Sequence, residues 1–238
     1  ESNPVLPIFI FDRNILDELI ADPHEEDKKD RRVEFIDQAL LDMQQKLVKM
    51  GSSLDVRYGT PLNIYKELLK EYKIEKVFTN HDYEPYAKKR DGEIEKLLKA
   101  EGVSFHTYKD QVLLEKNEVL KDDGKPYTIF TPYSRKWKAV LTEFHLKSYP
   151  NKKYFKNFYK QEEKKIIPLP EMGFQQADLP FPGKEWQGAI IRNYKQQRDI
   201  PSIPGTSRLS VHLRFGTISI RTLADEAGAL NETFLNEL

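Results

Sequence analysis

The first 108 residues alternate between short apolar runs and segments with helical spacing, and this alternation constrains the fold more than any other feature. Runs that are continuously apolar, or that alternate with period two, are typical of buried strands. Strands and helices in strict alternation indicate parallel strands joined by helices that cover both faces of a sheet. The predicted strands are 5–11, 54–58, 76–79 and 103–108, and the predicted helices are 33–50, 60–72 and 84–100.

The ends of these helices carry the expected signals. Gly51 and Gly102 each follow a helical pattern, where a left-handed residue commonly ends a helix. Thr60 and Pro61 stand at the start of another and predict an N-cap followed by a first-turn proline. The sequence therefore predicts an α/β domain with a parallel sheet over residues 1–129.

The pattern changes after residue 129, and we expect no strands after about residue 180. Residues 130–183 are predicted to connect two domains, and their part from 151 to 182 contains four prolines and little periodicity. Residues 151–165 hold six lysines and two glutamates, so we expect them to be exposed and mobile. Residues 184–238 predict the first part of an all-helical domain, with helices at 184–198, 206–215, 217–228 and 230–238.

Composition excludes several classes of protein. The 238 residues include 38 basic and 38 acidic side chains, so any affinity for a polyanion depends on where the charges lie. The chain has no cysteine, which excludes disulfides, thiol nucleophiles and cysteine-bound metals. No histidine pair has metal-ligand spacing, so we predict no metal. No apolar run is long enough for a membrane span and no signal peptide is visible, so we expect a cytoplasmic protein without a membrane partner.

The stretch from Tyr194 to Arg221 is the most informative about function. Between Gly188 and Arg221 the chain has six arginines or lysines against one acid, Asp199. Thr206 and Ser207 stand where a helix is predicted to begin, and helix starts bind anions through unpaired N–H groups. Together with Arg208 and Ser210 they predict a phosphate site. The alternative is that Thr206 is an ordinary N-cap and the arginines are solvated.

The string GTSRLSVHLRFGTISIR, residues 205–221, resembles the flavin-binding signature of DNA photolyases and cryptochromes. Three further strings resemble other parts of that family: VLPIFIFDRNIL its second strand, FTPYSRKWKAVL its inter-domain segment, and FLNEL the start of a helix at its substrate pocket. The resemblance covers nearly the whole chain. It implies a Rossmann-like α/β domain followed by the start of an all-helical flavin-binding domain.

The resemblance also implies a cofactor, a substrate and their residues. It implies flavin adenine dinucleotide (FAD) bound by residues at six positions, and a monomer that binds DNA containing pyrimidine dimers. Glu237 matches the glutamate that contacts the damaged bases and stabilises their radical anion, and Phe234 replaces a flavin-stacking tryptophan of some members. The implied FAD-binding residues are Tyr194, Thr206, Ser207, Arg208, Leu209 and Ser210.

Three functions remain as hypotheses. The first is deoxyribodipyrimidine photo-lyase activity, in which reduced FAD donates an electron to a dimer flipped out of the duplex. The second is blue-light signalling by a cryptochrome without repair. The third is a nucleotide-binding α/β module of another family. Glu237 favours repair over signalling, and the 206–210 motif argues against the third.

Residues 80–91 resemble the family's antenna region, which implies a second chromophore: a deazaflavin, a flavin or a folate. Folate-binding members carry Asn-Glu where this chain has Tyr86-Ala87, and this difference argues against a folate. Asp91 is the residue we would test first, although Arg90 and Asp91 also suit a plain helix surface.

The family normally has one more central strand before the point that matches residue 1, and roughly 200 further residues of helical domain. We therefore expect the chain to be a fragment whose sheet lacks a central strand. Such a fragment would bind FAD weakly or not at all and would be inactive by itself. Trp137 and Trp186 are expected to serve in packing.

Overall fold

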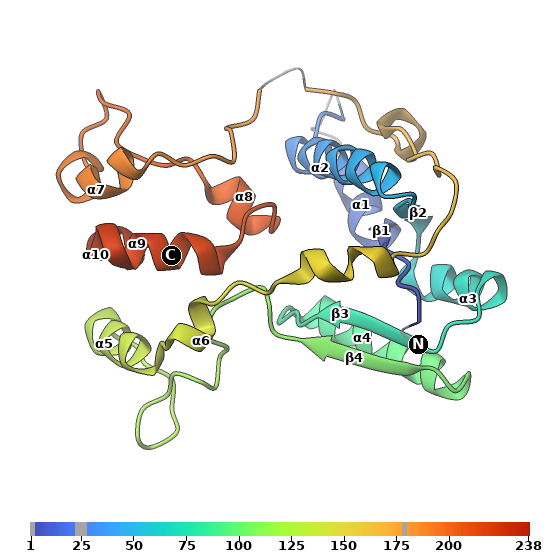
Figure 1. Cartoon of the computed structure of the whole chain (residues 1–238), viewed down its shortest axis with the longest axis horizontal. Coiled ribbons are helices and arrows are strands. Elements are labelled where there is room, and N and C mark those ends of the chain that lie inside the picture. Colours follow the sequence, from blue (N-terminus) through green and yellow to red (C-terminus); the bar gives the residue numbers. More distant parts are fainter. Residues whose placement is uncertain (1–2, 22–27, 178–179) are drawn as a thin grey trace. The chain divides into compact units, whose positions relative to one another are not determined.

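The computed structural model describes residues 3–21, 28–177 and 180–238 (Figure 1). The chain divides into two compact units. The first unit comprises Glu1–His106 and Pro150–Phe181, and the second comprises Thr107–Tyr149 and Pro182–Leu238. Each unit combines two segments that are far apart in the sequence. The domain boundaries expected at residues 129 and 183 stay a prediction.

The first unit has the predicted mixture of helices and parallel strands. Strand β1 (Ile8–Asp12) pairs in parallel with β2 (Asp55–Gly59), and Ile8 lies opposite Asp55. Strands β3 (Lys76–Asn80) and β4 (Ser104–Tyr108) form a second two-stranded sheet. The connecting helices are α1 (Arg13–Ile20), α2 (Arg31–Lys49), α3 (Pro61–Glu71) and α4 (Pro85–Ala100). The α/β class is thus confirmed, while the missing central strand stays a prediction.

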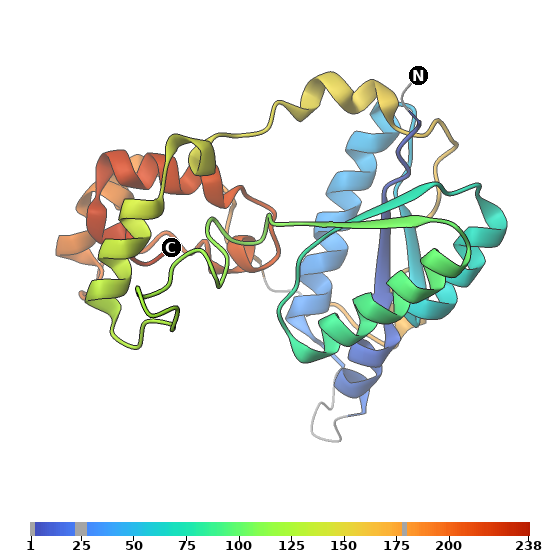
Figure 2. The same cartoon turned by 90° about the horizontal axis from the view of Figure 1, so that it is seen from below.

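Strand β1 is covered on both faces, as the apolar run predicts. Phe9 and Phe11 pack into a core with α2, whereas Ile8 and Ile10 pack against a second core formed by α3 and α4. Successive strand side chains point to opposite faces, so this alternation places one helical layer on each side of β1. Figure 2 shows α2 on one side of β1 and β2, and α3 with α4 on the other.

Local signals explain several helix ends in the first unit. The Asp30 carboxylate caps α2 by accepting from the backbone N–H of Arg32 at 2.8 Å. Gly51 and Gly102 follow α2 and α4 with φ of +72° and +73°, the left-handed conformation that glycine adopts without strain. Thr60 stands at the N-cap of α3, but its side chain makes no capping hydrogen bond, so Pro61 is the signal that operates there.

The four prolines and the missing periodicity of residues 151–182 suggest a linker that crosses the surface, but this interpretation is wrong, because part of the segment is buried. It contains two 3-10 helices, η1 (Asn151–Asn157) and η2 (Leu169–Met172). Leu169, Met172 and Phe174 are buried in the same core as Phe11 and Val56. Their irregular spacing gave no periodic signal, because 3-10 and extended backbone alternate here.

The second unit is helical, and the described residues after 180 contain no strand. Its helices are α5 (Phe130–Val140), α6 (Glu143–Leu146), α7 (Gly188–Gln197), α8 (Ser210–Arg214), α9 (Ile220–Leu230) and α10 (Glu232–Leu235). No helix in the described part of the chain has the length and apolarity needed to cross a bilayer. The core of this unit consists of Ile191, Leu209, Leu223, Ala227 and Phe234.

Candidate functional site

Four predicted or family-matched residues of the second unit come together where α7 meets α10. The rings of Tyr194 and Phe234 pack edge to face, with centroids 5.0 Å apart and an angle of 87° between their planes. The Arg198 guanidinium lies 5.6 Å from the centroid of the Tyr194 ring. Asn231 caps α10 by accepting from the backbone N–H of Phe234, which fixes the start of this short helix.

Glu237 completes this group, which we call the α7–α10 cluster (Tyr194, Arg198, Phe234 and Glu237). Its carboxylate forms an ion pair with Nη1 of Arg198 and raises the pKa of that guanidinium. The Glu237 side chain is 47% exposed, so an incoming molecule can reach it. In the sequence, Arg198 is one of the six arginines or lysines between Gly188 and Arg221. The ion pair was missed because its partners are 39 positions apart.

The predicted helix start at Thr206 was wrong, because the residues from Thr206 to Leu209 precede the helix. Helix α8 begins at Ser210 with Leu209 as its N-cap residue, and no side chain caps it. Two packing constraints explain this difference. A Cβ at Gly205 would lie 2.6 Å from the carbonyl oxygen of Gln197, so this residue must be glycine to pack against α7. Leu209 is buried in the core, and between these two points Arg208 adopts a left-handed φ of +56°.

The polar groups of this loop are free. Thr206, Arg208 and Ser210 are exposed and Ser207 is half-buried. Their hydroxyls and guanidinium have no bonding partner among the residues that the structure describes. Hydroxyl donors beside a guanidinium are a donor set that suits phosphate oxygens. Leu209 differs from its neighbours, because its side chain packs in the core that also contacts Tyr194.

His212 holds the start of α8 in place. Its Nε2 donates to the carbonyl oxygen of Pro182 at 2.8 Å, and its Nδ1 forms a hydrogen bond with the Thr217 hydroxyl at 2.7 Å. The imidazole is buried and both ring nitrogens are used. This histidine therefore orients α8 and the loop before it, which fits a structural role.

A cavity of about 330 Å³ lies in the second unit. Its lining includes Leu235, Asn236 and Leu238, which are sequence neighbours of Phe234 and Glu237. Its walls are mostly apolar, and Asn236, the residue before Glu237, contributes one of the few amides. The Ser134 hydroxyl donates to the Asn236 side chain at 3.2 Å. The wall from α5 consists of Phe130, Tyr133, Ser134 and Trp137.

A second polar cluster lies in the first unit, at the carboxyl end of β1. The Tyr86 hydroxyl donates to the Asp12 carboxylate and accepts from the Asn14 amide at 3.0 Å. Burial and the hydrogen bond to Asp12 raise the pKa of Tyr86. Arg90 lies 6.0 Å from the centre of the Tyr86 ring, and its Nε donates to Asp91 at 2.8 Å. Ligands of open α/β sheets commonly bind at the carboxyl ends of the strands.

Sequence reasoning found only part of this second cluster. It named Tyr86, Arg90 and Asp91, but it missed Asp12 and Asn14. The available signal was an acidic residue directly after a buried strand, the position from which parallel strands present side chains to a ligand.

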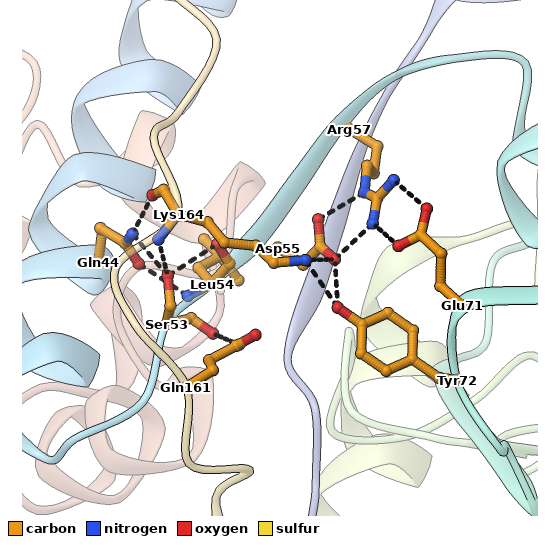
Figure 3. A network of polar contacts seen from close by, with 9 residues as sticks. All are labelled: Gln44, Ser53, Leu54, Asp55, Arg57, Glu71, Tyr72, Gln161 and Lys164. Atoms are coloured by element: carbon orange, nitrogen blue, oxygen red, sulfur yellow. Dashed lines mark hydrogen bonds and ion pairs between the residues drawn. The ribbon is translucent and has the colours of Figure 1, made fainter. Parts of the chain in front are cut away.

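A third group of polar residues, at the amino end of β2, forms a network of charges that pair with one another (Figure 3). The buried Asp55 carboxylate accepts from Arg57 Nε at 2.6 Å and from Lys164 Nζ at 2.6 Å. Burial alone would raise the pKa of Asp55, but the hydrogen bonds from Arg57 and Lys164 outweigh it and hold that pKa below its ordinary value. Since the charges are mutually paired, the network ties secondary-structure elements together.

Comparisons with known proteins point to one family. Residues 1–169 match the family model described as DNA photolyase. The chain is 28% identical over 240 residues to the deoxyribodipyrimidine photo-lyase of Halobacterium salinarum, and this match covers 96% of the chain and 48% of that relative. The chain thus spans about half the length of this curated relative.

Two solved structures share the fold. A bacterial class III photolyase from Agrobacterium tumefaciens superposes with a TM-score of 0.74 at 19% identity, covering 99% of the chain and 50% of that structure. An archaeal photolyase from Sulfolobus tokodaii, described as containing two FAD molecules, gives a TM-score of 0.68 at 24% identity, covering 99% and 51%.

Proposed function

This chain belongs to the DNA photolyase family, and on that premise we propose that the full-length protein uses light to split cyclobutane pyrimidine dimers in DNA. The observation that carries the proposal is the α7–α10 cluster. It presents the half-exposed carboxylate of Glu237 beside the Arg198 cation and the aromatic pair Tyr194 and Phe234. A carboxyl group and a guanidinium are suited to hydrogen-bond a base edge and a backbone phosphate of a flipped-out nucleotide.

The residues of the 206–210 loop fit the phosphate part of FAD. Their hydroxyls and guanidinium are free among the described residues, so they need not break existing bonds to bind an anion. Thr206, Ser207, Arg208 and Ser210 would hold the pyrophosphate, with Tyr194 nearby and Leu209 acting through its backbone. Reduced FAD, when bound, would supply the electron that splits the dimer.

Glu237 and Arg198 of the α7–α10 cluster would act on the substrate. Glu237 would donate or accept a hydrogen bond at the damaged bases as negative charge develops on them. Arg198 would hold Glu237 in place until the substrate arrives and would then be close to the DNA backbone. Phe234 would keep the site dry on its buried side, since it lies in the core of the second unit.

The cluster at the carboxyl end of β1 is the proposed site of an antenna chromophore. Tyr86 provides a ring face under the Arg90 guanidinium, and Asp91 and Asp12 provide acceptors. A planar chromophore with N–H or O–H donors, such as a deazaflavin or a flavin, suits this set. A folate stays the less favoured choice. The monomeric state and the cytoplasmic location also stay predictions.

The decisive experiment uses the full-length protein with bound reduced FAD and an oligonucleotide that contains one thymine dimer. We expect the dimer to be split under blue light and to remain intact in the dark. A protein that binds FAD but leaves the dimer intact in the light would instead fit the signalling function of a cryptochrome.

A further inference from the structure

A basic segment of the first unit lies outside both candidate sites. Between Pro150 and Gln161 the sequence has four lysines and no acidic residue. Lys152, Lys153 and Lys156 are exposed, and the Tyr154 side chain between them is 57% exposed. We call these four residues the basic strip.

The backbone arranges the strip along one short helix. All four residues belong to η1, drawn in yellow in Figure 2. A 3-10 helix has three residues per turn, so Lys153 and Lys156 lie one above the other on the same edge. The Lys153 ammonium lies 5.0 Å from the centroid of the Tyr154 ring. Charge and aromatic surface are therefore combined within two turns.

Hydrogen bonds join the segment that carries the strip to the rest of the first unit. Val5 donates to the Asn157 carbonyl at 2.8 Å and accepts from the Tyr159 N–H at 2.9 Å. The Lys160 ammonium donates to the Met50 carbonyl at 2.6 Å, at the end of α2. The rings of Phe155 and Phe158 stack with centroids 5.5 Å apart. The exposed lysines thus project from a segment whose downstream end is bonded to the first unit.

The three lysines have no ion-pair partner among the described residues. The chain has equal numbers of basic and acidic residues, so a local excess of this kind is what can attract a polyanion. Lysines are point charges that suit phosphates without reading sequence, and an exposed aromatic ring can stack on an unpaired base. A lipid surface would need an exposed apolar helix face, but Phe155 is half-buried and stacked on Phe158.

We propose that the basic strip is a sequence-independent DNA contact, with Lys152, Lys153 and Lys156 on backbone phosphates and Tyr154 against a base or sugar. This inference rests on the proposed function in one respect, because both take DNA as the partner. It adds a contact surface on the first unit that recognises the backbone and carries no part of the chemistry.

The test compares a triple variant, Lys152→Gln, Lys153→Gln and Lys156→Gln, with the unaltered protein. Binding of a labelled, undamaged DNA duplex is measured in the dark over a range of salt concentrations. Each lost phosphate contact should lower the slope of log affinity against log salt by about 0.9, and affinity at low salt should fall roughly tenfold. Replacing the same lysines with arginine should restore binding.

A matched control removes the same charge elsewhere on the first unit. Lys66, Lys96 and Lys99 are exposed on α3 and α4, and their triple change to glutamine should leave the salt slope unchanged. The inference is overturned if the two triple variants lose equal affinity, if the strip variant binds like the unaltered protein, or if the unaltered protein binds anionic vesicles but no DNA. Light-driven splitting of a dimer is measured in parallel. If the unaltered protein repairs dimers and the strip variant binds DNA as well as the unaltered protein does, the inference about the strip is refuted while the proposed function stands.

Discussion

The Lys164 ammonium lies 2.6 Å from the Asp55 carboxylate, although the two residues are 109 positions apart in the chain. The backbone N–H of Lys164 also donates to the Ser53 hydroxyl at 2.9 Å. The segment after η1 is thereby joined to the start of β2, as Figure 3 shows. This relationship explains why residues that read as a connection in the sequence belong to the first unit.

Replacing Lys164 with methionine should therefore destabilise the first unit. The variant removes one of two cations that compensate a carboxylate whose side chain is only 3% exposed, while Arg57 remains. We expect the free energy of unfolding in urea to fall by about 1–2 kcal/mol. Lys165 is exposed beside it, and Lys165→Met should change stability by less than about 0.5 kcal/mol. Equal effects of the two variants would contradict this account.

The lowered pKa of Asp55 predicts a specific acid sensitivity. A carboxyl group with a lowered folded-state pKa stabilises the fold while it is ionised, so its contribution is present above the unfolded pKa of about 3.9 and is lost as pH falls through the lower folded value. Asp55→Asn should lower stability at pH 7 and flatten the stability curve in this acid range. Asp42→Asn, at an exposed position, should leave the acid limb of the curve in place.

Asp37 should show the opposite sign. Burial and the neighbouring Glu34 raise the pKa of Asp37, so the folded state binds this proton more tightly than the unfolded state. Ionisation of Asp37 therefore lowers the free energy of unfolding as pH rises through its raised folded-state pKa. This loss is absent below the pKa of Asp37 in the unfolded state. Asp37→Asn should raise the free energy of unfolding at pH 7 by up to about 1 kcal/mol, with no gain near pH 3. A loss of stability at pH 7 would contradict this prediction.

The periodic parts of the fold were predictable because burial imposes a period. The apolar run before Asp12 and the helical spacing from residue 33 onward placed β1 and α2 to within a few residues. The same reasoning could not see Leu169, Met172 and Phe174, which enter the core from irregular backbone that has no period.

The candidate sites were likewise predictable only where local sequence motifs determine them. Local motifs predict an anion site at Thr206 to Ser210, but they do not predict the conformation of the loop. Its left-handed Arg208 follows from the close packing of Gly205 on α7, which is a tertiary contact. The ion pair of Arg198 with Glu237 and the bond between Tyr86 and Asp12 join distant positions, and no local signal encodes such pairs.

The free guanidinium of Arg208 should matter for the cofactor in the full-length protein. Arg208→Ala removes a charge-assisted donor worth about 1.5–3 kcal/mol, so retained FAD should fall roughly tenfold or more. Arg208→Gly should lose FAD equally without backbone strain, because glycine accepts the left-handed φ. The exposed Lys195 is the control, and Lys195→Ala should keep its FAD. The flavin-to-protein absorbance ratio measures all three, and unchanged occupancy in both Arg208 variants would rule the side chain out as a ligand.

The Glu237 carboxylate carries the proposed function, so its charge should affect repair but not FAD binding. Glu237→Gln keeps the size of the side chain and an acceptor for Arg198, but it removes the negative charge and the acid proton. In the full-length protein we expect the light-driven rate of dimer splitting to fall about tenfold, the equivalent of one charge-assisted hydrogen bond, while FAD content stays the same. Glu232 is the first residue of α10, five positions before Glu237; it is well exposed and pairs with Lys138, so Glu232→Gln should repair at the unaltered rate. If both variants repair dimers equally well, Glu237 does not act on the substrate, and its bond to Arg198 would then be only a contact between α7 and the end of α10.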